Sequence, residues 1–373
     1  MSEKLNILHV ASWFPSEKEP MLGNFIERHV EAASDHTNGW VLYAVPHEED
    51  RIDISEGENF KKCLVYFKRK RPIVDHYMAL ERGFDQIAKR DFYPDMIHLH
   101  VTYPAGQWVI GRKLPFVVTE HFTGFHDYSD FKWSPYRKWT TSRILNKAQR
   151  ILPVSERLGE AITKFRVKSP MQKVSNVVAT CFYPAAQHLE TKPLRFLHVS
   201  SLVNAQKNIT GLLTGFKLAQ DAGLDFHLTI GGDGDVKLLE KWIYESGLDT
   251  SRITTFGMST PQQIAELMRA NHCFVLFSNV ENQPVVILEA LSTGIPVIST
   301  DVGGIFEELK AENGNLIAAK NTEALKYALL DMQKSIHQYS AKTISAEALA
   351  KYSRKAVGAT LLSVYQQVLA DKR

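Results

Sequence analysis

Two glutamates in one stretch could hold the hydroxyl groups of a ligand. Glu281 and Glu289 stand eight positions apart in residues 278–304, SNVENQPVVILEALSTGIPVISTDVGG. This stretch predicts a strand, a polar loop, a helix, a turn and a second strand. Pro284 suits the first helical position, because its fixed φ and missing N–H cost nothing there, and Gly294 predicts the helix end. The sequence therefore predicts a short helix directly after an acidic, polar loop.

The start of this helix predicts an anion site. Its first backbone N–H groups, about Val285 and Val286, have no partner within the helix and lie at the positive end of the helix dipole. Such an end suits a diphosphate. Glu281 would lie in the loop before the site and Glu289 inside the helix, so the two carboxylates would flank the diphosphate. A bare pair of glutamates at this spacing would equally fit a solvated face with a helix charge.

The whole phrase is more specific than the pair. A Glu-x7-Glu pattern from Glu281 to Glu289, followed by alanine and by a turn with glycine, proline and valine, resembles the signature of the retaining glycosyltransferases of family 4. The resemblance implies that the first glutamate holds sugar hydroxyls near the reacting carbon and that the second holds ribose hydroxyls. It places Asn282 and Gln283 in the same donor-binding loop. Both roles suit carboxylates, which accept hydrogen bonds only.

The stretch FLHVSSLVNAQKNITGLL resembles the family's first strand and loop of the nucleotide domain. An arginine and a lysine there hold the diphosphate in the family. Lys207 fills the lysine position, whereas the arginine position falls on or near Ser201. A hydroxyl donates one hydrogen bond but carries no charge, so another cation or the helix N-terminus would have to compensate.

Other glycines of this half predict close approaches of the backbone. Residues 231–235, Gly-Gly-Asp-Gly-Asp, fail as a dinucleotide fingerprint, because Lys237 holds the third glycine position. They also fail as an Asp-x-Asp metal motif, since they follow a strand of the second lobe. The resemblance implies a glycine turn at the nucleotide edge instead, and it places Gly257 and Met258 where backbone meets the base. Gly303 and Gly304 predict a loop near the sugar, whereas Glu307 and Glu308 fit a helix face.

The N-terminal half carries the expected acceptor side. Gly23 and Asn24 match the position of the family's glycine-rich loop, which has one glycine here instead of two, and the helix after them contains His29. Gly23 would let backbone approach the phosphate or the acceptor. The alternative is an ordinary turn between a strand and a helix.

Histidines end two apolar strands of this half. His121 ends FVVTEH, and family counterparts contact the donor sugar, so His121 is the expected histidine of the site. His98 and His100 share one strand face by the two-residue period, which raises the possibility of a metal pair. No third ligand follows at metal-site spacing, so packing is favoured for both, with His100 as a candidate on the acceptor side. We expect no metal and no other cofactor.

These residues need strands to position them. Apolar, β-branched runs alternate with helix-period segments in both halves, which predicts two parallel α/β lobes. The first lobe is predicted from the runs LNILHVA, WVLYAV, MIHLHV, FVVTEH and RILPVS, and the second from LRFLHVS, FHLTIGG, ITTFG, CFVLFS, IPVIST and GNLI. Most motif residues fall at the carboxyl ends of these strands, where doubly wound sheets bind ligands. The resemblance implies the GT-B fold, two Rossmann-like domains that face each other across a cleft.

Length and linker composition predict the domain boundaries. A chain of 373 residues suits two domains. The proline-bounded polar stretch 184–193 predicts the linker, so residues 1–185 form an acceptor-side domain and 186–353 a donor-binding domain. The amphipathic segment TLLSVYQQVLA resembles the family's terminal helix, which implies that residues 354–373 return to the first domain.

Charge and apolar patterning restrict the partners. Residues 61–173 hold 22 Lys and Arg against 10 Asp and Glu, so the first half could favour an anionic membrane or an anionic acceptor. A solvated charged face is the alternative. No nucleic-acid module accompanies the charge, no run of 18 apolar residues predicts a spanning helix, and no signal peptide is expected. The three cysteines fit a reduced cytoplasmic protein, with peripheral contact to the inner face of the inner membrane as an option.

The expected reaction follows from the resemblance. A nucleotide-diphosphate sugar, with UDP favoured and GDP-mannose close behind, would donate its sugar to a glycan or lipid-linked acceptor with retention and without a metal. Surface polysaccharide synthesis is the expected setting. The catalytic candidates are Glu281, His121 and Lys207. Two rivals remain, a nucleotide-sugar epimerase on the same fold and a silent nucleotide-sugar-binding partner.

Overall fold

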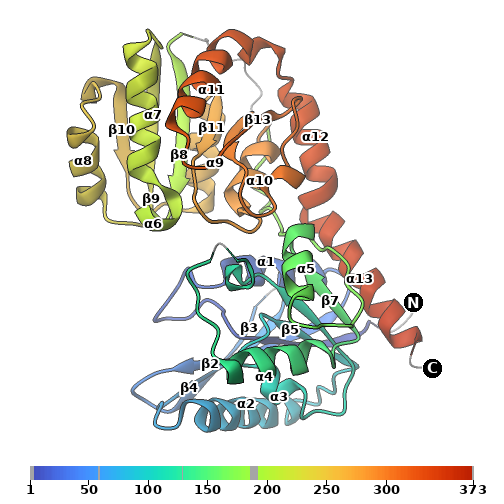
Figure 1. The fold of residues 1–373 in the computed structure, drawn as a ribbon. Coiled ribbons are helices and arrows are strands. Elements are labelled where there is room, and N and C mark those ends of the chain that lie inside the picture. Colours follow the sequence, from blue (N-terminus) through green and yellow to red (C-terminus); the bar gives the residue numbers. More distant parts are fainter. Residues whose placement is uncertain (1–3, 58, 128, 185–191, 372–373) are drawn as a thin grey trace. The chain divides into compact units, whose positions relative to one another are not determined.

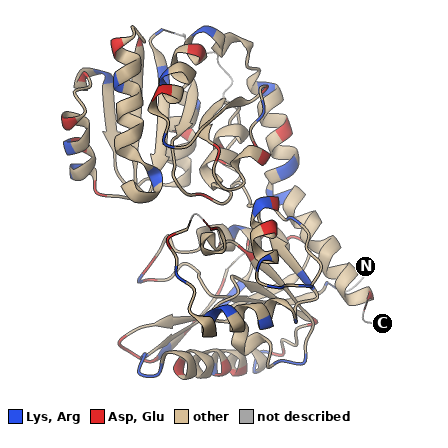
Figure 2. Cartoon of the chain, in the orientation of Figure 1, with Lys and Arg blue, Asp and Glu red and all other residues tan. Residues whose placement is uncertain are grey.

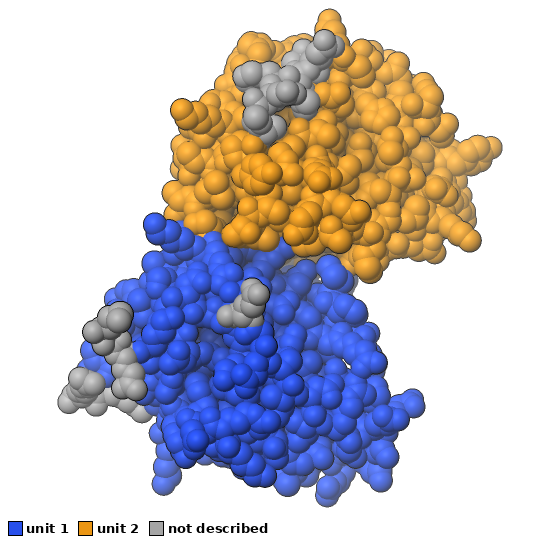
Figure 3. Space-filling view, turned by 180° about the vertical axis from the view of Figure 1, so that it is seen from behind, with its two compact units in different colours: residues 1–177, 354–373 blue, residues 178–353 orange. Residues whose placement is uncertain are grey.

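The chain divides into two units, each built around its own sheet. A computed structural model describes residues 4–57, 59–127, 129–184 and 192–371. Unit 1 comprises residues 1–177 and 354–373, and unit 2 comprises residues 178–353 (Figure 3). Unit 2 thus begins eight residues before position 186, because Val178 donates its backbone N–H to Tyr352 and its side chain packs in the unit 2 core. The predicted linker, 184–193, lies almost wholly outside the described residues.

Unit 1 is built on one sheet, seven-stranded in its described part (Figure 1). The strands are β1 (Asn6–Ala11), β2 (Asn38–Pro46), β3 (Arg51–Glu56), β4 (Lys61–Phe67), β5 (Met96–His100), β6 (Phe116–Glu120) and β7 (Arg150–Pro153). Their order is β3-β4-β2-β1-β5-β6-β7, so the direction of winding reverses at β1. All pairs are parallel except β3 with β4, an antiparallel edge pair. The sequence analysis did not predict this pair, because β3 carries alternating charges and β4 begins with two lysines.

Helices supply the other layers of unit 1. They are α1 (Asn24–Ser34), α2 (Pro72–Ala88), α3 (Gly106–Val109), the 3-10 turn η1 (Thr123–Phe125), α4 (Pro135–Leu145), α5 (Glu156–Thr163) and the terminal α13 (Arg354–Ala370). α2 begins at Pro72, because the fixed φ of proline is compatible with the first helical position. α13 packs on α1 and buries Leu361 and Tyr365, so the last segment of the chain belongs to unit 1.

Unit 2 repeats the α/β architecture. Its strands are β8 (Leu194–Ser200), β9 (Phe226–Gly232), β10 (Ile253–Phe256), β11 (Cys273–Leu276), β12 (Val297–Thr300) and β13 (Gly314–Ile317), all parallel in the order β10-β9-β8-β11-β12-β13. Its helices are α6 (Asn204–Lys207), α7 (Ile209–Asp221), α8 (Val236–Glu245), α9 (Pro261–Ala270), α10 (Val285–Ser292), α11 (Thr322–Ser335) and α12 (Ala341–Tyr352), with 3-10 turns η2 (Thr250–Arg252), η3 (Ile305–Glu307) and η4 (Ile336–Gln338). The predicted class, two doubly wound α/β domains, is confirmed.

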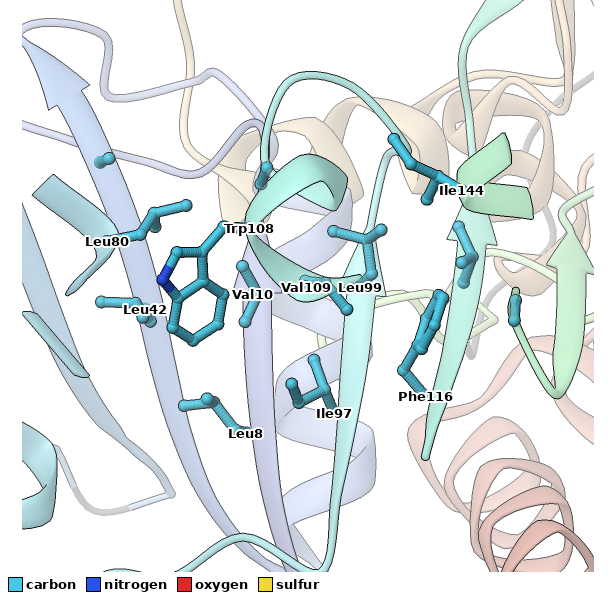
Figure 4. Packing of buried hydrophobic residues seen from close by; sticks show 14 of the residues in the cluster. Leu8, Val10, Leu42, Leu80, Ile97, Leu99, Trp108, Val109, Phe116 and Ile144 are labelled. Carbon is cyan, nitrogen blue, oxygen red and sulfur yellow. The ribbon is translucent and has the colours of Figure 1, made fainter. Parts of the chain in front are cut away.

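Each sheet is buried on both faces, as parallel sheets are. In unit 1, the fully buried Trp108 of α3 lies among Val10, Leu42 and Leu80, which joins α2 and α3 to the sheet (Figure 4). In unit 2, Phe196, Phe216 and Phe226 of β8, α7 and β9 pack together, with an edge-to-face and a tilted ring contact. These cores hold the carboxyl ends of the strands in fixed positions. Among the described residues, no helix is both long enough and apolar enough to span a membrane.

Candidate functional site

An ion pair joins two loops of unit 2 at the carboxyl ends of adjacent strands. Lys207 ends α6, which follows β8, and Glu281 lies in the loop after β11. Nζ of Lys207 lies 2.5 Å from Oε1 of Glu281, and the two side chains are 17% and 9% exposed. Ser278 Oγ donates to the same carboxylate oxygen at 2.8 Å. The structure therefore brings together the two charged residues that were predicted to bind the donor phosphate and sugar.

Backbone contacts hold the Glu281 loop in place. Gly303 has φ +57°, and a Cβ at this position would overlap the carbonyl oxygen of Glu281. The N–H of Gly304 donates to the Asn282 carbonyl at 2.7 Å. Glycine is required at 303 for both its left-handed conformation and this close approach. The loop predicted to pass near the sugar thus supports Glu281 itself.

The side chains next to Glu281 enter a buried network. Nε2 of Gln283 donates to Oε1 of Glu308 at 2.6 Å, and the hydroxyl of Tyr352 donates to the other oxygen of Glu308. Glu308 is 5% exposed, so its side chain is a buried acceptor and not part of a solvated helix face. Burial, followed by the charge of Glu308, raises the pKa of Tyr352. The network ties the loop to η3 and α12, a role that the sequence did not reveal.

The helix after this loop is α10, Val285–Ser292. Pro284, predicted as the first helical residue, is instead the N-cap, with φ −68° and ψ 117°. Val285 and Val286 are the first residues of the helix. Their N–H groups have no acceptor one turn earlier in the helix, so they point out of its positive end. Glu289 lies on the second turn and is 7% exposed. The end of α10 at Ser292, with Gly294 at φ +83°, agrees with the predicted stop.

Ser201 and the glycine turn lie near the same strand ends. Ser201 directly follows β8, the neighbour of β11. Gly232 has φ +146°, and a Cβ there would overlap the Ser200 carbonyl, so β9 can approach β8 only with glycine. Asp235 caps α8 by accepting hydrogen bonds from the N–H groups of Lys237 and Leu238 at 2.9 and 3.1 Å. A helix cap therefore accounts for this aspartate without a metal motif.

Gly257 and Met258 lie farther away. They follow β10, which is the edge strand and is separated from β11 by β9 and β8. Strands in a sheet are about 4.8 Å apart, so β10 is roughly 14 Å from β11. The Met258 side chain is 69% exposed. The structure thus places these two residues after a strand that lies two positions beyond β8, away from β11 and the Glu281 loop.

In unit 1, Gly23 and Asn24 begin α1. Gly23 is the N-cap with φ +72°, and its Cβ would lie 2.8 Å from the backbone of Trp13. Gly23 therefore approaches the loop after β1 of its own chain. This geometry fits the second of the two predictions for Gly23, an ordinary turn between a strand and a helix. Asn24 is the first residue of the helix and is partly exposed.

The histidines of unit 1 form one buried cluster. Register places His9 of β1 opposite His98 of β5, and the rings of His98 and His100 stack with centroids 4.0 Å apart. Nδ1 of His9 lies 3.1 Å from Nε2 of His100. His100 has no exposed surface, so its ring is a core residue instead of a wall of an open acceptor site. His121 follows β6, is 8% exposed and packs on Phe25 at 4.6 Å between centroids.

Burial keeps these rings neutral. It lowers the pKa of His9 to about 3 and that of His29 to about 4, and it lowers the pKa of His98, His100 and His121 well below the ordinary value. Neighbouring histidines add to the effect on His9, His98, His100 and His121. Neutral imidazoles can pair with each other and with backbone carbonyls, as His29 does with Ser175 at 2.9 Å.

The structure places a third histidine next to His98 and His100, although none follows them at metal-site spacing in the sequence. His9, His98 and His100, and likewise His29, His100 and His121, have ligand atoms within 4.8 Å of one another. The strand register that brings in His9 cannot be seen in sequence spacing. However, both ring nitrogens of His98 are already hydrogen-bonded, to Tyr365 and Thr119 at 2.7 and 2.6 Å. His98 therefore has no free lone pair with which to bind a metal alongside His9 and His100. Hydrogen bonding and stacking account for its geometry.

Two family models match the chain. Residues 41–180 match Glycosyltransferase Family 4, and residues 182–356 match Glycosyl transferases group 1. A curated relative from Bacillus subtilis, named for teichuronic acid biosynthesis as the glycosyltransferase TuaC, is 26% identical over 260 residues. The match covers 65% of this chain and 62% of that relative's length. The chain thus spans less than two thirds of that relative.

Solved structures share the fold. Sucrose-phosphate synthase from Thermosynechococcus elongatus superposes with a TM-score of 0.81 at 18% identity, over 99% of this chain and 100% of that one. Anabaena Alr3699/HepE, solved in complex with UDP and glucose, gives a TM-score of 0.69 at 14% identity, over 97% and 100% of the two chains. At these identities the superpositions establish the fold alone. With this fold and with family models matching both of its units, the chain belongs to the group 1 glycosyltransferases of GT-B fold.

Proposed function

We propose that the chain is a retaining glycosyltransferase that binds a nucleotide-diphosphate sugar mainly in unit 2. The observation that carries this proposal is the Lys207–Glu281 pair, which joins the end of α6 to the loop immediately before the N-terminus of α10. A cation, a helix N-terminus and two buried carboxylates gathered at the ends of adjacent strands suit the parts of such a donor. The phosphates need positive charge, and the sugar and ribose hydroxyls need acceptors.

The roles of these residues follow from their chemistry. The N–H groups of Val285 and Val286 and the ammonium of Lys207 would stabilise the charge that develops on the leaving diphosphate. Glu281 would accept hydrogen bonds from sugar hydroxyls, and Glu289 from ribose hydroxyls. Lys207 already contacts Glu281, so one residue can couple the sugar and phosphate subsites. Ser201 would donate a neutral hydrogen bond to a phosphate.

The proposed transfer needs no protein nucleophile. The bond between the anomeric carbon and the phosphate oxygen breaks, and the acceptor oxygen bonds to the same face of that carbon. The acceptor proton passes to the departing phosphate oxygen, so configuration is retained and atoms balance. The positive charge at the phosphates comes from Lys207 and α10, which is why we propose that the reaction is independent of a metal. His121, neutral and nearly buried, would serve as a hydrogen-bonding partner of the donor sugar and not as a cation.

UDP is the favoured nucleotide of the donor, and GDP is the second. A structural neighbour solved with UDP and glucose supports this order. The relative named for teichuronic acid biosynthesis supports a role in surface polysaccharide synthesis.

We further propose that the acceptor is a glycan or a lipid-linked glycan bound in unit 1. The exposed Tyr136 and Trp139 of α4, next to Lys138 and Arg143, support peripheral contact with an anionic membrane from the cytoplasm.

The test is thermal unfolding with UDP, GDP and their common sugar conjugates in EDTA. We expect one nucleotide to raise the melting temperature without metal, and we expect Glu289→Ala to abolish that shift. Glu266→Ala, an exposed helical glutamate of the same unit, is the matched control and should keep the shift. A protein that responds to no nucleotide, or responds only with a divalent cation, would contradict the proposed donor site.

A further inference from the structure

A cavity opens in unit 1 at the carboxyl ends of its central strands. It has a volume of about 270 Å³ and is lined by the last residues of β2 and β4, by residues that follow β1, β4 and β5, and by residues of α2, α3 and α4. The strand order reverses at β1, and ligands of doubly wound sheets bind outside such a reversal point. The volume is near the lower end for ligand pockets, about 300 Å³, and suits a single sugar ring.

Aromatic side chains form much of the cavity wall. Trp13 and Tyr103 line it with partly exposed rings, and Phe67 and Trp108 close it from the core side. The faces of aromatic rings are electron-rich, whereas the C–H groups on a pyranose face carry slight positive charge. Such walls suit a sugar better than they suit a simple inorganic ion.

Arg137 of α4 provides the first cation of the cavity. Its guanidinium carbon lies 4.5 Å from the ring centroid of Tyr103 and 4.6 Å from that of Phe131, and Phe122 and Trp133 follow at 5.8 Å. Within the described chain, Arg137 forms no salt bridge to a carboxylate, and its Nε is buried without a hydrogen-bond partner. Aromatic packing fixes the guanidinium. The charge of Glu120 acts on it, but the guanidinium forms no salt bridge with that carboxylate.

Arg69 provides a second cation, and no carboxylate lines the cavity. Arg69 follows β4, is exposed and has no salt bridge among the residues that the structure describes. His76 also lines the wall, but burial and the nearby Arg69 lower its pKa to about 4, so it is neutral. Glu120 lines only a smaller neighbouring hollow, and its two oxygens accept hydrogen bonds from Thr102, His121 and Phe122. The positive residues of α4 are visible as blue bands in Figure 2.

An aromatic cavity lined by two arginines, neither of which forms a salt bridge within the described chain, calls for a ligand that is both ring-shaped and anionic. We infer that this cavity binds the terminal sugar of the acceptor, and that this sugar carries a carboxylate or a phosphate held by Arg137 and Arg69. The inference rests on the proposed function, since it assigns the acceptor of that reaction. The two acidic groups share one chemistry, because guanidinium binds both in a bidentate way.

The test compares acidic and neutral sugars on the full chain by isothermal titration calorimetry. The probes are methyl glucuronide for the carboxylate, glucose 6-phosphate for the phosphate and methyl glucoside as the neutral ring. We expect at least one acidic probe to bind about tenfold more tightly than the neutral one, since a hydrogen bond to a charged group is of that order. The more strongly bound acidic probe identifies which group the acceptor carries.

Three variants locate the binding. Arg69→Gln and Arg137→Met should each weaken the acidic probe about tenfold and leave the neutral probe unchanged. Arg90→Gln is the matched control, an exposed arginine just beyond the far end of α2, and should bind like the wild type. If Arg137→Met fails to fold, the exposed Arg69 still decides the question. Equal binding of acidic and neutral probes, or equal loss in Arg90→Gln, would overturn the inference.

Nucleotide response separates the two proposals. A wild-type protein that is stabilised by a nucleotide but binds no acidic sugar contradicts only the acceptor inference. A protein that binds acidic sugars but responds to no nucleotide contradicts the proposed function. If Arg69→Gln and Arg137→Met lose the nucleotide response instead, the cavity belongs to the donor and the acceptor inference is wrong.

Discussion

Lys207 and Glu281 are 74 residues apart in the chain, yet Nζ and Oε1 of these residues lie 2.5 Å apart. The contact exists because β8 and β11 are neighbours in the sheet, so the loops after them meet. Both side chains are largely buried, which makes the loss of either partner costly, because the remaining charge would lie in a poorly solvated site.

Substitution of this pair should reduce transfer without additive effects. We expect Lys207→Met and Glu281→Gln each to lower kcat by about 100-fold or more, since each removes a group placed to stabilise developing charge or to hold the sugar. The double variant should be little worse than either single one, because the residues act as a unit. Steady-state kinetics with the preferred donor measure this. Losses that multiply in the double variant would show that the two residues act independently.

Gly303→Ala should displace the Glu281 loop. The added Cβ would overlap the Glu281 carbonyl, and the left-handed φ of +57° is unfavourable for alanine. We expect a loss of about 2 kcal/mol or more in the free energy of unfolding and a weaker nucleotide response. Urea unfolding and thermal shift measure the two effects. Gly223→Ala, at φ +90° with open space around it, controls for backbone strain alone and should keep the nucleotide response.

Asp235→Ala should lower stability through the lost helix cap. Its carboxylate accepts two N–H groups at the start of α8, and such caps contribute about 1 kcal/mol. The exposed Asp233 makes no such cap, so Asp233→Ala should change the urea midpoint very little. Neither variant should alter activity through a metal, because we assign no metal to this turn. A restoration of activity by added Mn²⁺ or Mg²⁺ in either variant would contradict that assignment.

Acid should destabilise the protein below pH 6.5. The folded-state pKa is about 3 for His9 and about 4 for His29, His76 and His198, against 6.5 for an ordinary histidine. Between pH 6.5 and 4 the unfolded chain binds protons that the folded chain excludes. The contribution to stability is therefore complete above pH 6.5 and is lost as the pH falls towards 4, by up to about 1.4 kcal/mol per pH unit for each group.

The pH dependence can be assigned to one residue. His198→Gln should flatten the slope of unfolding free energy against pH between 6.5 and 4, because it removes one buried group that must be protonated on unfolding. His337→Gln, at an exposed position of the same unit, is the matched comparison. Urea unfolding at several pH values gives the slopes. An unchanged slope in His198→Gln would contradict the lowered pKa of His198.

The sequence by itself determined the elements and the local motifs. The apolar runs located every strand except the edge pair β3 and β4, and the phrase around Glu281 and Glu289 placed α10 within one residue of its observed start. These features are local: strand burial on both faces, helix caps and glycine turns leave their marks within a few positions of the chain.

Only the tertiary structure decided which side chains meet. The Lys207–Glu281 pair, the approach of Gly303 to Glu281, the placement of His9 against His100 and the aromatic surroundings of Arg137 join residues from separate strands and loops. The sequence did not predict these contacts, because they depend on strand order, register and packing, which are set by burial of the whole core. The sequence determines the chemistry of each side chain, and the tertiary structure determines which side chains lie next to it.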